Sequence, residues 1–206
     1  MLETSDQIET FIDRMAGHFP HQPTEGQGRL IHALARFFFS TQPRCTIMIR
    51  GYAGTGKTTS VGALVGALRT YGQRPVLLAP TGRAAKVMQS YARMHASTIH
   101  RHIYRSRKST DGNPAFGLAP NTLENTVFIV DEASMIGEGG QRSSQQSLIY
   151  RSLLDDLMEF VFSGAGCRLV LVGDDAQLPP VGESESPALN ENQMRRDFAL
   201  TVATMR

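Results

Sequence analysis

The stretch Gly51-Tyr-Ala-Gly-Thr-Gly-Lys-Thr58 has the residue types and spacing of a loop that binds phosphate groups. Glycines allow the backbone N–H groups of such a loop to curl around phosphates at the start of a helix. We expect Lys57 to neutralise the β- and γ-phosphates of a nucleotide, Thr58 to offer its hydroxyl to Mg²⁺, and Thr59 to support the α-phosphate. The other loop positions expected to line the nucleotide are Ala53, Gly54, Thr55 and Gly56.

A second candidate for phosphate chemistry is the apolar run Thr126–Val130, which ends in two carboxylates, Asp131 and Glu132. Alone, this pattern usually marks a strand that leaves the core for solvent. Downstream of a phosphate-binding loop, it predicts that Asp131 holds Mg²⁺ through water and that Glu132 polarises the water that attacks the γ-phosphate. The two elements together predict the hydrolysis of ATP with Mg²⁺ as cofactor.

Apolar runs of strand length alternate along the chain with stretches whose apolar residues recur every three or four positions. The predicted strands are Cys45–Ile49, Pro75–Ala79, Val127–Val130 and Arg168–Val172. The predicted helices are Ser5–Ala16, Glu25–Phe39, Lys57–Tyr71, Gly82–Met94 and Leu148–Phe162. Nearly continuous apolar strands are typical of a mostly parallel sheet with helices on both faces. We therefore expect an α/β fold in one domain over residues 1–206, with a helical segment over about residues 1–40.

Two polar stretches rich in small residues, Gly137–Ser147 and Glu183–Asn192, predict mobile surface loops. The two cysteines, Cys45 and Cys167, border apolar runs and are expected to be small buried strand residues. Their positions suggest neither a disulfide framework nor a metal site, which favours a reducing cytoplasm. The longest apolar runs are only strand-sized, so no membrane partner is expected.

Basic and acidic residues are unevenly distributed, although the net charge is only +2. Residues 26–110 hold 14 of the 21 Lys and Arg and no Asp or Glu, which leaves 7 basic and all 19 acidic residues for the remainder. The two portions therefore carry formal charges of +14 and −12. This favours a polyanionic partner such as nucleic acid. The alternative is that the charges scatter over all faces of the fold and cancel in space.

Four further stretches resemble motifs Ia, Ib, II and III of superfamily 1B helicases of the RecD and Dda type, in the same order and at similar spacing. They are Ala79–Met88, Ser97–His100, Asp131–Met135 and Gly173–Gly182. The resemblance covers nearly the whole chain from about residue 23. It implies a RecA-like P-loop domain that binds ATP and Mg²⁺ and grips single-stranded DNA as the enzyme moves 5′ to 3′ into duplex forks, in DNA repair or recombination.

The resemblance also implies which residues contact DNA. By matching position they are Pro80, Thr81, Gly82, Arg83, Thr98 and His100. Independently of the family, Thr81 and Thr98 lie near ends of predicted helices, where hydroxyl and free N–H groups bind phosphate oxygens. The alternative for each threonine is a helix N-cap. His100 and His102 are spaced like neighbours on a strand rather than like the ligands of a metal site.

Three more positions match nucleotide-contacting residues of the family. Gln177 would sense the γ-phosphate, Gln27 would read the adenine, and Arg206, in a stretch that loosely resembles the approach to motif IV, would reach the γ-phosphate. Residues Thr24 to Gln27 also fit a capping box, and the two roles of Gln27 can coexist. Motifs V and VI are absent from the sequence. We therefore expect a fragment whose partner, the second RecA-like motor domain, belongs to a longer parent chain.

Residues 103–121 are predicted to form a small inserted hairpin, where the family places a device that splits the duplex. Ile103–Lys108 alternates roughly between apolar and basic, Asp111-Gly112 is a turn signal, and Ala115–Leu118 returns as the second strand. The side chains expected to meet DNA there are Arg105, Arg107 and Lys108 at phosphates, and Phe116 or Tyr104 on a base. The alternative is a solvated surface loop with incidental basic residues.

Other proteins with a phosphate-binding loop fit the sequence less well. A small-molecule kinase does not need the Gln-Leu-Pro-Pro that follows the strand-terminal Gly-Asp, and neither the Asn-Lys-x-Asp of GTPases nor the Leu-Ser-Gly-Gly-Gln of ABC ATPases occurs. The remaining alternative to a helicase motor is a regulatory DNA-binding module that binds ATP without unwinding. Lys57, Asp131, Glu132 and Gln177 together favour an active motor.

Overall fold

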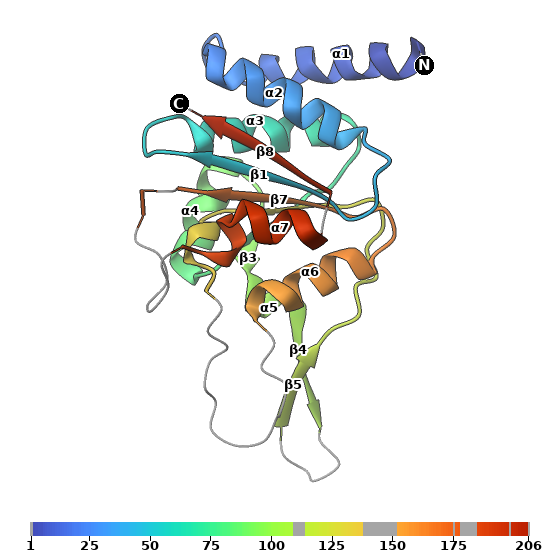
Figure 1. The fold of residues 1–206 in the computed structure, drawn as a ribbon, viewed down its shortest axis with the longest axis vertical. Helices are drawn as coiled ribbons and strands as arrows, with labels where there is room; N and C mark the ends of the chain where they lie inside the picture. The colour runs from blue at the N-terminus through green and yellow to red at the C-terminus, as the bar shows by residue number, and fades with distance from the viewer. Residues whose placement is uncertain are drawn as a thin grey trace.

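The computed structural model describes residues 2–108, 114–137, 152–174, 176–177, 185–197 and 199–205 (Figure 1). Its helices are α1 (Leu2–Gly17), α2 (Glu25–Phe38), α3 (Lys57–Thr70), α4 (Gly82–Ala92), α5 (Ile99–Ile103), α6 (Leu153–Ser163) and α7 (Glu191–Asp197), with 3₁₀ turns η1 (Ala133–Met135) and η2 (Pro187–Leu189). Its strands are β1 (Cys45–Gly51), β2 (Val76–Ala79), β3 (Ala96–Thr98), β4 (Tyr104–Lys108), β5 (Pro114–Leu118), β6 (Val127–Val130), β7 (Arg168–Gly173) and β8 (Ala199–Met205).

Six strands form one sheet in the order β3-β2-β6-β7-β1-β8, and every neighbouring pair is parallel. Their carboxyl ends therefore meet at one edge, which is where open α/β sheets bind ligands. Strand β7 separates β1 from β6, so the segments that follow these three strands are neighbours at that edge. The predicted α/β fold is confirmed, and β4 and β5 form the separate antiparallel pair expected of the hairpin.

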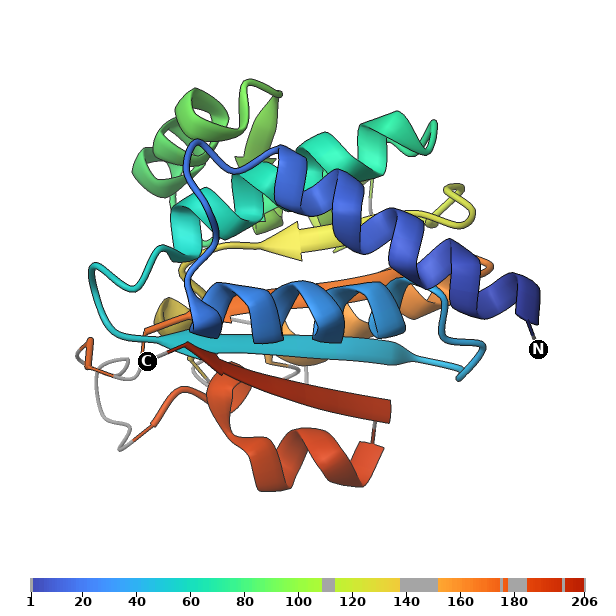
Figure 2. The same ribbon diagram turned by 90° about the horizontal axis from the view of Figure 1, so that it is seen from above.

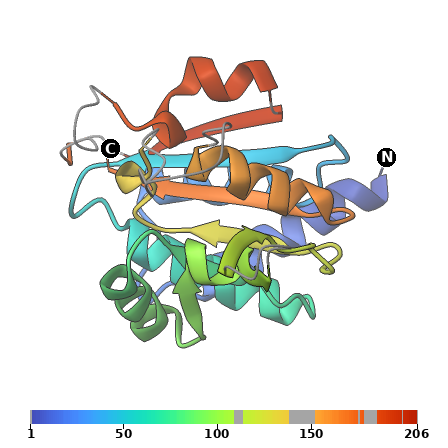
Figure 3. The same ribbon diagram turned by 90° about the horizontal axis from the view of Figure 1, so that it is seen from below.

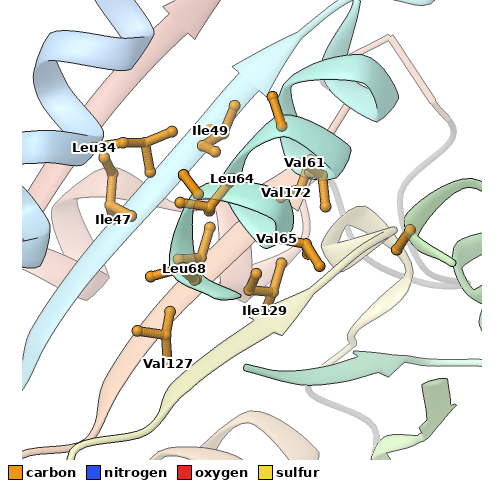
Figure 4. Close-up of a cluster of buried hydrophobic side chains, with 14 of the residues drawn as sticks. Leu34, Ile47, Ile49, Val61, Leu64, Val65, Leu68, Val127, Ile129 and Val172 are labelled. Atoms are coloured by element: carbon orange, nitrogen blue, oxygen red, sulfur yellow. The ribbon is translucent and has the colours of Figure 1, made fainter. Parts of the chain in front are cut away.

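Helices cover both faces of the sheet: α1 to α4 lie on one face, and α5, α6 and α7 lie on the other (Figures 2 and 3). Strand β1 shows how the sequence produces this arrangement, because Ile47 and Ile49 enter the first hydrophobic cluster and Met48 enters the second. Figure 4 shows the first cluster, in which side chains of α3 meet those of the strands. Burial on both faces explains why the strands read as continuous apolar runs.

The prediction of a mobile loop over Glu183–Asn192 is wrong for its described part. Pro187–Leu189 forms the turn η2 and is buried, and α7 begins at Glu191. The hydroxyl of Ser186 donates to the backbone carbonyls of Ala133 and Ile136, at 3.0 and 2.6 Å. Ala188 and Leu189 belong to the second hydrophobic cluster, and their burial outweighs the polar composition around them. The other predicted loop lies, beyond Gly137, outside the described residues.

Several short elements were not foreseen, namely β3, α5, α7 and the edge strand β8. His100 and His102 belong to helix α5, so the expected strand-like spacing of these two residues is wrong. A two-residue step turns about 200° around a helix, which directs the two rings to different sides. Both cysteines are buried and free, as expected. None of the helices that the structure describes is long and apolar enough to cross a membrane.

Candidate nucleotide-binding site

The phosphate-binding loop connects β1 to α3, as the sequence predicts. Gly54 and Gly56 have φ of +82° and +87°, which side chains disfavour. A Cβ on Gly56 would also collide with the side-chain amide of Gln27. Gly56 is the N-cap of α3 and provides no side-chain hydrogen bond to the helix. The first backbone N–H groups of α3 are therefore left for an anion, which is the arrangement that nucleotide phosphates require.

The ammonium group of Lys57 is held inside the loop. It donates to the backbone carbonyls of Gly51 and Tyr52, the latter at 2.9 Å, and pairs with the carboxylate of Asp174 at 3.2 Å. The side chains of Lys57 and Asp174 are only 16% and 5% exposed. One carboxylate and two carbonyls thus hold the lysine ammonium close to the position where β- and γ-phosphates would lie.

Asp174 was not among the predicted site residues, although it lies in the stretch that resembles motif III. It follows β7 directly, and β7 is the neighbour of β1 in the sheet, so the topology brings its carboxylate to the loop. The second carboxylate oxygen accepts from the backbone N–H of Ala176 at 3.0 Å. The signal available in the sequence was the Gly-Asp at the end of a predicted strand. Its partner 117 positions away appears only in the fold.

The carboxylate of Asp131 is fixed by two hydrogen bonds. The hydroxyl of Tyr91 donates to one oxygen at 2.6 Å, and the backbone N–H of Glu132 donates to the other at 2.9 Å. Burial, and then the negative charge of Asp131, raises the pKa of the Tyr91 hydroxyl, so it remains a donor at neutral pH. Sequence reasoning did not identify Tyr91, because nothing in the spacing of a tyrosine on α4 indicates that it reaches the end of β6.

Glu132 adopts a left-handed backbone conformation, with φ of +56°, between β6 and the turn η1. Strained backbone of this kind is costly outside glycine and often occurs at functional positions. In the part of the chain that the structure describes, the Glu132 carboxylate has no hydrogen-bond or ion-pair partner. Two residues later the hydroxyl of Ser134 donates to the side-chain oxygen of Gln177 at 3.0 Å. The stretches after β6 and β7 are thus joined directly.

Gln27 caps helix α2 and also lies beside the phosphate-binding loop. Its side-chain oxygen accepts from the backbone N–H of Thr24 at 3.0 Å, and its own N–H donates to the Thr24 hydroxyl at 3.3 Å, so the capping box of α2 is present. The amide nitrogen of the same side chain lies against Gly56. Gln27 is therefore both a helix cap and a neighbour of the phosphate-binding loop.

A family model described as an AAA domain matches residues 24–201. The chain belongs to this family. The sequence is 34% identical over 138 residues to the ATP-dependent RecD2 DNA helicase of Deinococcus radiodurans, which covers 66% of this chain and 16% of that protein. It is 28% identical over 210 residues to the multifunctional conjugation protein TraI of Escherichia coli K12, which covers 100% of this chain and 10% of TraI.

These relatives confirm the resemblance to helicases of the RecD type, and this AAA domain spans only about a tenth to a sixth of their length. A crystal structure of Pif1 helicase from Candida albicans has a similar fold. Its TM-score is 0.52 at 18% identity, over 88% of this chain and 40% of that chain. The AAA domain thus shares its fold with part of that helicase.

The edge of the AAA domain beyond the nucleotide loop carries the residues predicted to bind DNA. β2 and β3 are neighbours, with Ala79 opposite Thr98. Thr81 and Thr98 accept from the backbone N–H of Ala84 and Arg101, both at 3.2 Å, and so cap α4 and α5. The N-cap alternative is therefore present at both threonines. It is compatible with a DNA contact, because each hydroxyl retains further capacity to bond.

The histidines of α5 have different surroundings. His100 is exposed, and its ring lies 5.7 Å from that of Tyr104. The ring of His102 packs on Phe128 and Phe160, with ring centroids 6.0 and 5.5 Å apart. Burial, and then the nearby Arg105, lowers the pKa of His102 and favours its neutral form. His100 is therefore the more exposed of the two histidines.

The base of the hairpin is fixed to the body of the domain. The Tyr104 hydroxyl donates to Asp156 of α6 at 2.6 Å, which holds this side chain at the base of the hairpin. That Tyr104 or Phe116 stacks on a base stays a prediction. The Arg105 guanidinium donates to the carbonyls of Arg101, His102 and Tyr104 at the end of α5. Side chains of Arg107, Lys108, Phe116 and Arg206 lie outside the described residues.

Proposed function

We propose that this chain is the ATP-binding motor domain of an ATP-dependent DNA helicase, which couples ATP hydrolysis to 5′ to 3′ movement on single-stranded DNA. The observation that carries the proposal is the meeting of three motifs at one sheet edge. Lys57 of the phosphate loop pairs with Asp174 after β7, and Gln177 nearby is bonded to Ser134 after β6. These bonds connect the phosphate loop to the segments after β7 and β6, so the loss of the γ-phosphate can affect both segments.

The donor set fits a Mg²⁺ nucleotide. Hydroxyl and carboxylate oxygens such as those of Thr58 and Asp131 suit this ion, which is usually held by one or two side chains together with substrate phosphates. Consistently, no cluster of three or more potential metal ligands occurs within the described ranges. Bound Mg²⁺ would neutralise charge that develops on the phosphates.

The remaining steps belong to side chains of this chain. Lys57 would leave its loop carbonyls and contact the β- and γ-phosphates, while the N–H groups at the start of α3 hold the triphosphate. Glu132, whose carboxylate is unengaged, would orient the attacking water. Gln177 would respond to the γ-phosphate and transmit its loss to Ser134. Gln27, beside Gly56, would contact the adenine.

The DNA strand would lie along the neighbouring ends of β2 and β3. Pro80, Thr81, Gly82 and Arg83 would meet one phosphate, and Thr98 and His100 the next. Because β2 adjoins β6, which carries Asp131, the DNA edge and the nucleotide edge are continuous. A shift of β2 relative to β6 would therefore couple hydrolysis to a movement of the strand.

We further propose that catalysis is completed by a second RecA-like domain of a longer parent protein, with Arg206 reaching the γ-phosphate. The test is the ATPase rate of the parent and of residues 1–206, each with and without single-stranded DNA. Stimulation of the parent is expected, with turnover by residues 1–206 about 10³-fold slower, because residues 1–206 lack the arginines of the second domain and the loss of one such arginine has an effect of that size in phosphoryl transfer. A parent whose turnover ignores DNA would be a regulatory module and not a motor.

The hairpin of β4 and β5 is proposed to separate the strands of the duplex. Its base, fixed at Tyr104 and Asp156, would hold the hairpin as a wedge. Removal of residues 106–117 from the parent should abolish unwinding and spare DNA-stimulated ATP hydrolysis. The Tyr104→Phe variant, which keeps the hairpin and loses only its anchor, is the matched comparison. Unchanged unwinding by the deletion variant would exclude the separating role.

A further inference from the structure

A basic groove runs along the outside of α3 and α4, which pack side by side (Figure 2). One hollow of about 550 Å³ extends from Thr58 and Thr59 at the start of α3 to Arg69 near its end. A second hollow of about 530 Å³ lies beside Arg74 and the first residues of β2 and β3. Arg69 and Arg93 line both hollows, so the two hollows are adjacent, and together they are called the groove below.

The groove is positive and lacks internal neutralisation. No Asp or Glu lines either hollow. Arg69, Arg74 and Arg93 are exposed, and within the described residues none of these three guanidinium groups has a hydrogen-bond or ion-pair partner. His95 adds a further exposed polar ring. Part of the positive charge of residues 26–110, which contain no Asp or Glu, therefore lies together in this groove and is not spread evenly over the surface.

The arginines are held at fixed positions by the fold. Arg69 belongs to the last turn of α3, and Arg74 precedes β2 directly. Arg93 ends α4 in a left-handed conformation, with φ of +49°, which turns the chain toward β3. From Thr58 to Arg69, α3 rises by about 17 Å, at about 1.5 Å per residue. A strand that runs the length of α3 would therefore meet the groove with several successive phosphates, more than a short oligonucleotide can supply.

We propose that this groove binds the phosphate backbone of single-stranded nucleic acid, as a site separate from the edge at Thr81 and Thr98. A concave, positive groove that follows a backbone is the usual form of sequence-independent single-strand binding. A duplex, being wide and convex, would touch only the rims. The inference rests on the proposed function in one respect, which is that DNA is the polyanion this chain handles.

The position of the groove gives it a second consequence. Tyr91, whose hydroxyl holds Asp131, also lines the first hollow together with Thr58 and Thr59. A strand in the groove would therefore touch the side chain that fixes the metal-binding carboxylate. Occupation of the groove is expected to alter the response of the nucleotide site to Mg²⁺.

The test compares the double variant Arg69→Gln/Arg74→Gln with the control Arg29→Gln/Arg36→Gln in the 206-residue chain. The control removes the same charge from exposed positions of α2, outside the groove. Binding of two single-stranded oligonucleotides, of about 4 and about 16 nucleotides, would be measured by fluorescence anisotropy over a range of salt concentrations. Thermal unfolding of all variants establishes that they are folded.

For the long oligonucleotide, the groove variant should bind about 2- to 30-fold more weakly, as expected for two exposed charge pairs. The slope of log affinity against log salt should fall by about 1.4, because each phosphate contact in a single strand contributes about 0.7. The short oligonucleotide is expected to occupy the edge at Thr81. The groove variant should therefore bind it with the same affinity as the control variant does.

Other outcomes separate the two proposals. If the unmodified chain binds no single-stranded DNA, both the groove and the proposed function fail. If it binds and the groove variant matches the control on the long oligonucleotide, only the groove proposal fails. An equal loss on both lengths would indicate a small-anion pocket and overturns the proposal.

Discussion

The starts of α3 and α4 are two versions of the same feature. Both helices follow parallel strands whose ends meet at one edge of the sheet, and both are proposed to face phosphate groups. α4 begins at Thr81, whose hydroxyl accepts from the backbone N–H of Ala84 at 3.2 Å. α3 begins at Gly56, which supplies no side-chain cap. At the start of α4, a side chain of the protein accepts a hydrogen bond from a free backbone N–H group. At the start of α3, no side chain does so, and a ligand can accept these hydrogen bonds instead.

The difference indicates how each start uses binding energy. An uncapped helix start leaves N–H donors that gain strongly from an anion, which suits tight binding of a nucleotide. A capped start is already stable without a ligand, so an added phosphate gains less, which suits a strand that must be released at every step. Under the proposed function, the same domain therefore has a tight phosphate site after β1 and a weak one after β2. Strand β2 adjoins β6, which is followed by Asp131, the proposed ligand of Mg²⁺.

The largest expected effect concerns ATP hydrolysis at the sheet edge, where the start of α3 lies near the segment after β6. Glu132→Gln should leave ATP affinity nearly unchanged and reduce turnover by about 10²- to 10⁴-fold, the usual contribution of a group that positions or accepts a proton. Lys57→Ala should weaken ATP binding itself, and it leaves the buried Asp174 without its cation. Nucleotide binding and single-turnover hydrolysis separate the two. Equal loss of affinity in both variants would show that the role of Glu132 is assigned wrongly.

The next effect tests why α3 must begin with glycine. Gly56→Ala and Gly54→Ala each place a side chain at positive φ, at a cost of about 1 to 2 kcal/mol. Only the alanine at position 56 also meets a neighbour, Gln27, because no atom lies within 4 Å of a Cβ on Gly54. Gly56→Ala should therefore reduce ATP affinity and stability more than Gly54→Ala. If the two variants have the same ATP affinity and the same unfolding temperature, the side chain of Gln27 moves away from position 56 at no cost.

A smaller effect is expected where α4 reaches the metal-binding carboxylate. Tyr91→Phe removes one hydrogen bond to Asp131 and keeps the ring, so the Mg²⁺ concentration for half-maximal hydrolysis should rise by about 2- to 13-fold, the equivalent of about 0.5 to 1.5 kcal/mol. When EDTA removes Mg²⁺, the variant and the natural chain should bind ATP with the same affinity. A general structural defect would instead weaken ATP binding with or without Mg²⁺. Tyr71→Phe is the control, since that ring packs among Phe11, Phe38 and Phe39. An unchanged Mg²⁺ profile removes Tyr91 from the site.

The smallest effect separates capping from DNA contact at the start of α4. Thr81→Ala should cost about 1 kcal/mol of stability through loss of the cap. Thr81→Asp keeps a capping oxygen and should be about as stable as the natural chain, yet its charge repels a phosphate. Weaker DNA binding by both variants, with stability lost in only one, supports a DNA contact at Thr81. If Thr81→Asp binds DNA normally, the threonine is a cap alone.

Local patterns in the sequence were sufficient for the main elements. Strand Val127–Val130 was predicted with its observed bounds, and α3 was predicted to within one residue, because glycines, β-branched runs and helical spacing act over a few positions. The capping box at Thr24 and the hairpin strands were also predicted for this reason. The DNA-contact roles assigned to Thr98 and His100 stay predictions.

Long-range partners were decided only by the tertiary structure. The sequence by itself predicted that Lys57 and Asp131 belong to a nucleotide site. It did not determine that Asp174 holds the lysine or that Tyr91 holds the carboxylate, because these bonds join residues 117 and 40 positions apart. The order of strands in a sheet brings such residues together, and that order depends on how helices cover both faces. No short window of sequence contains that information.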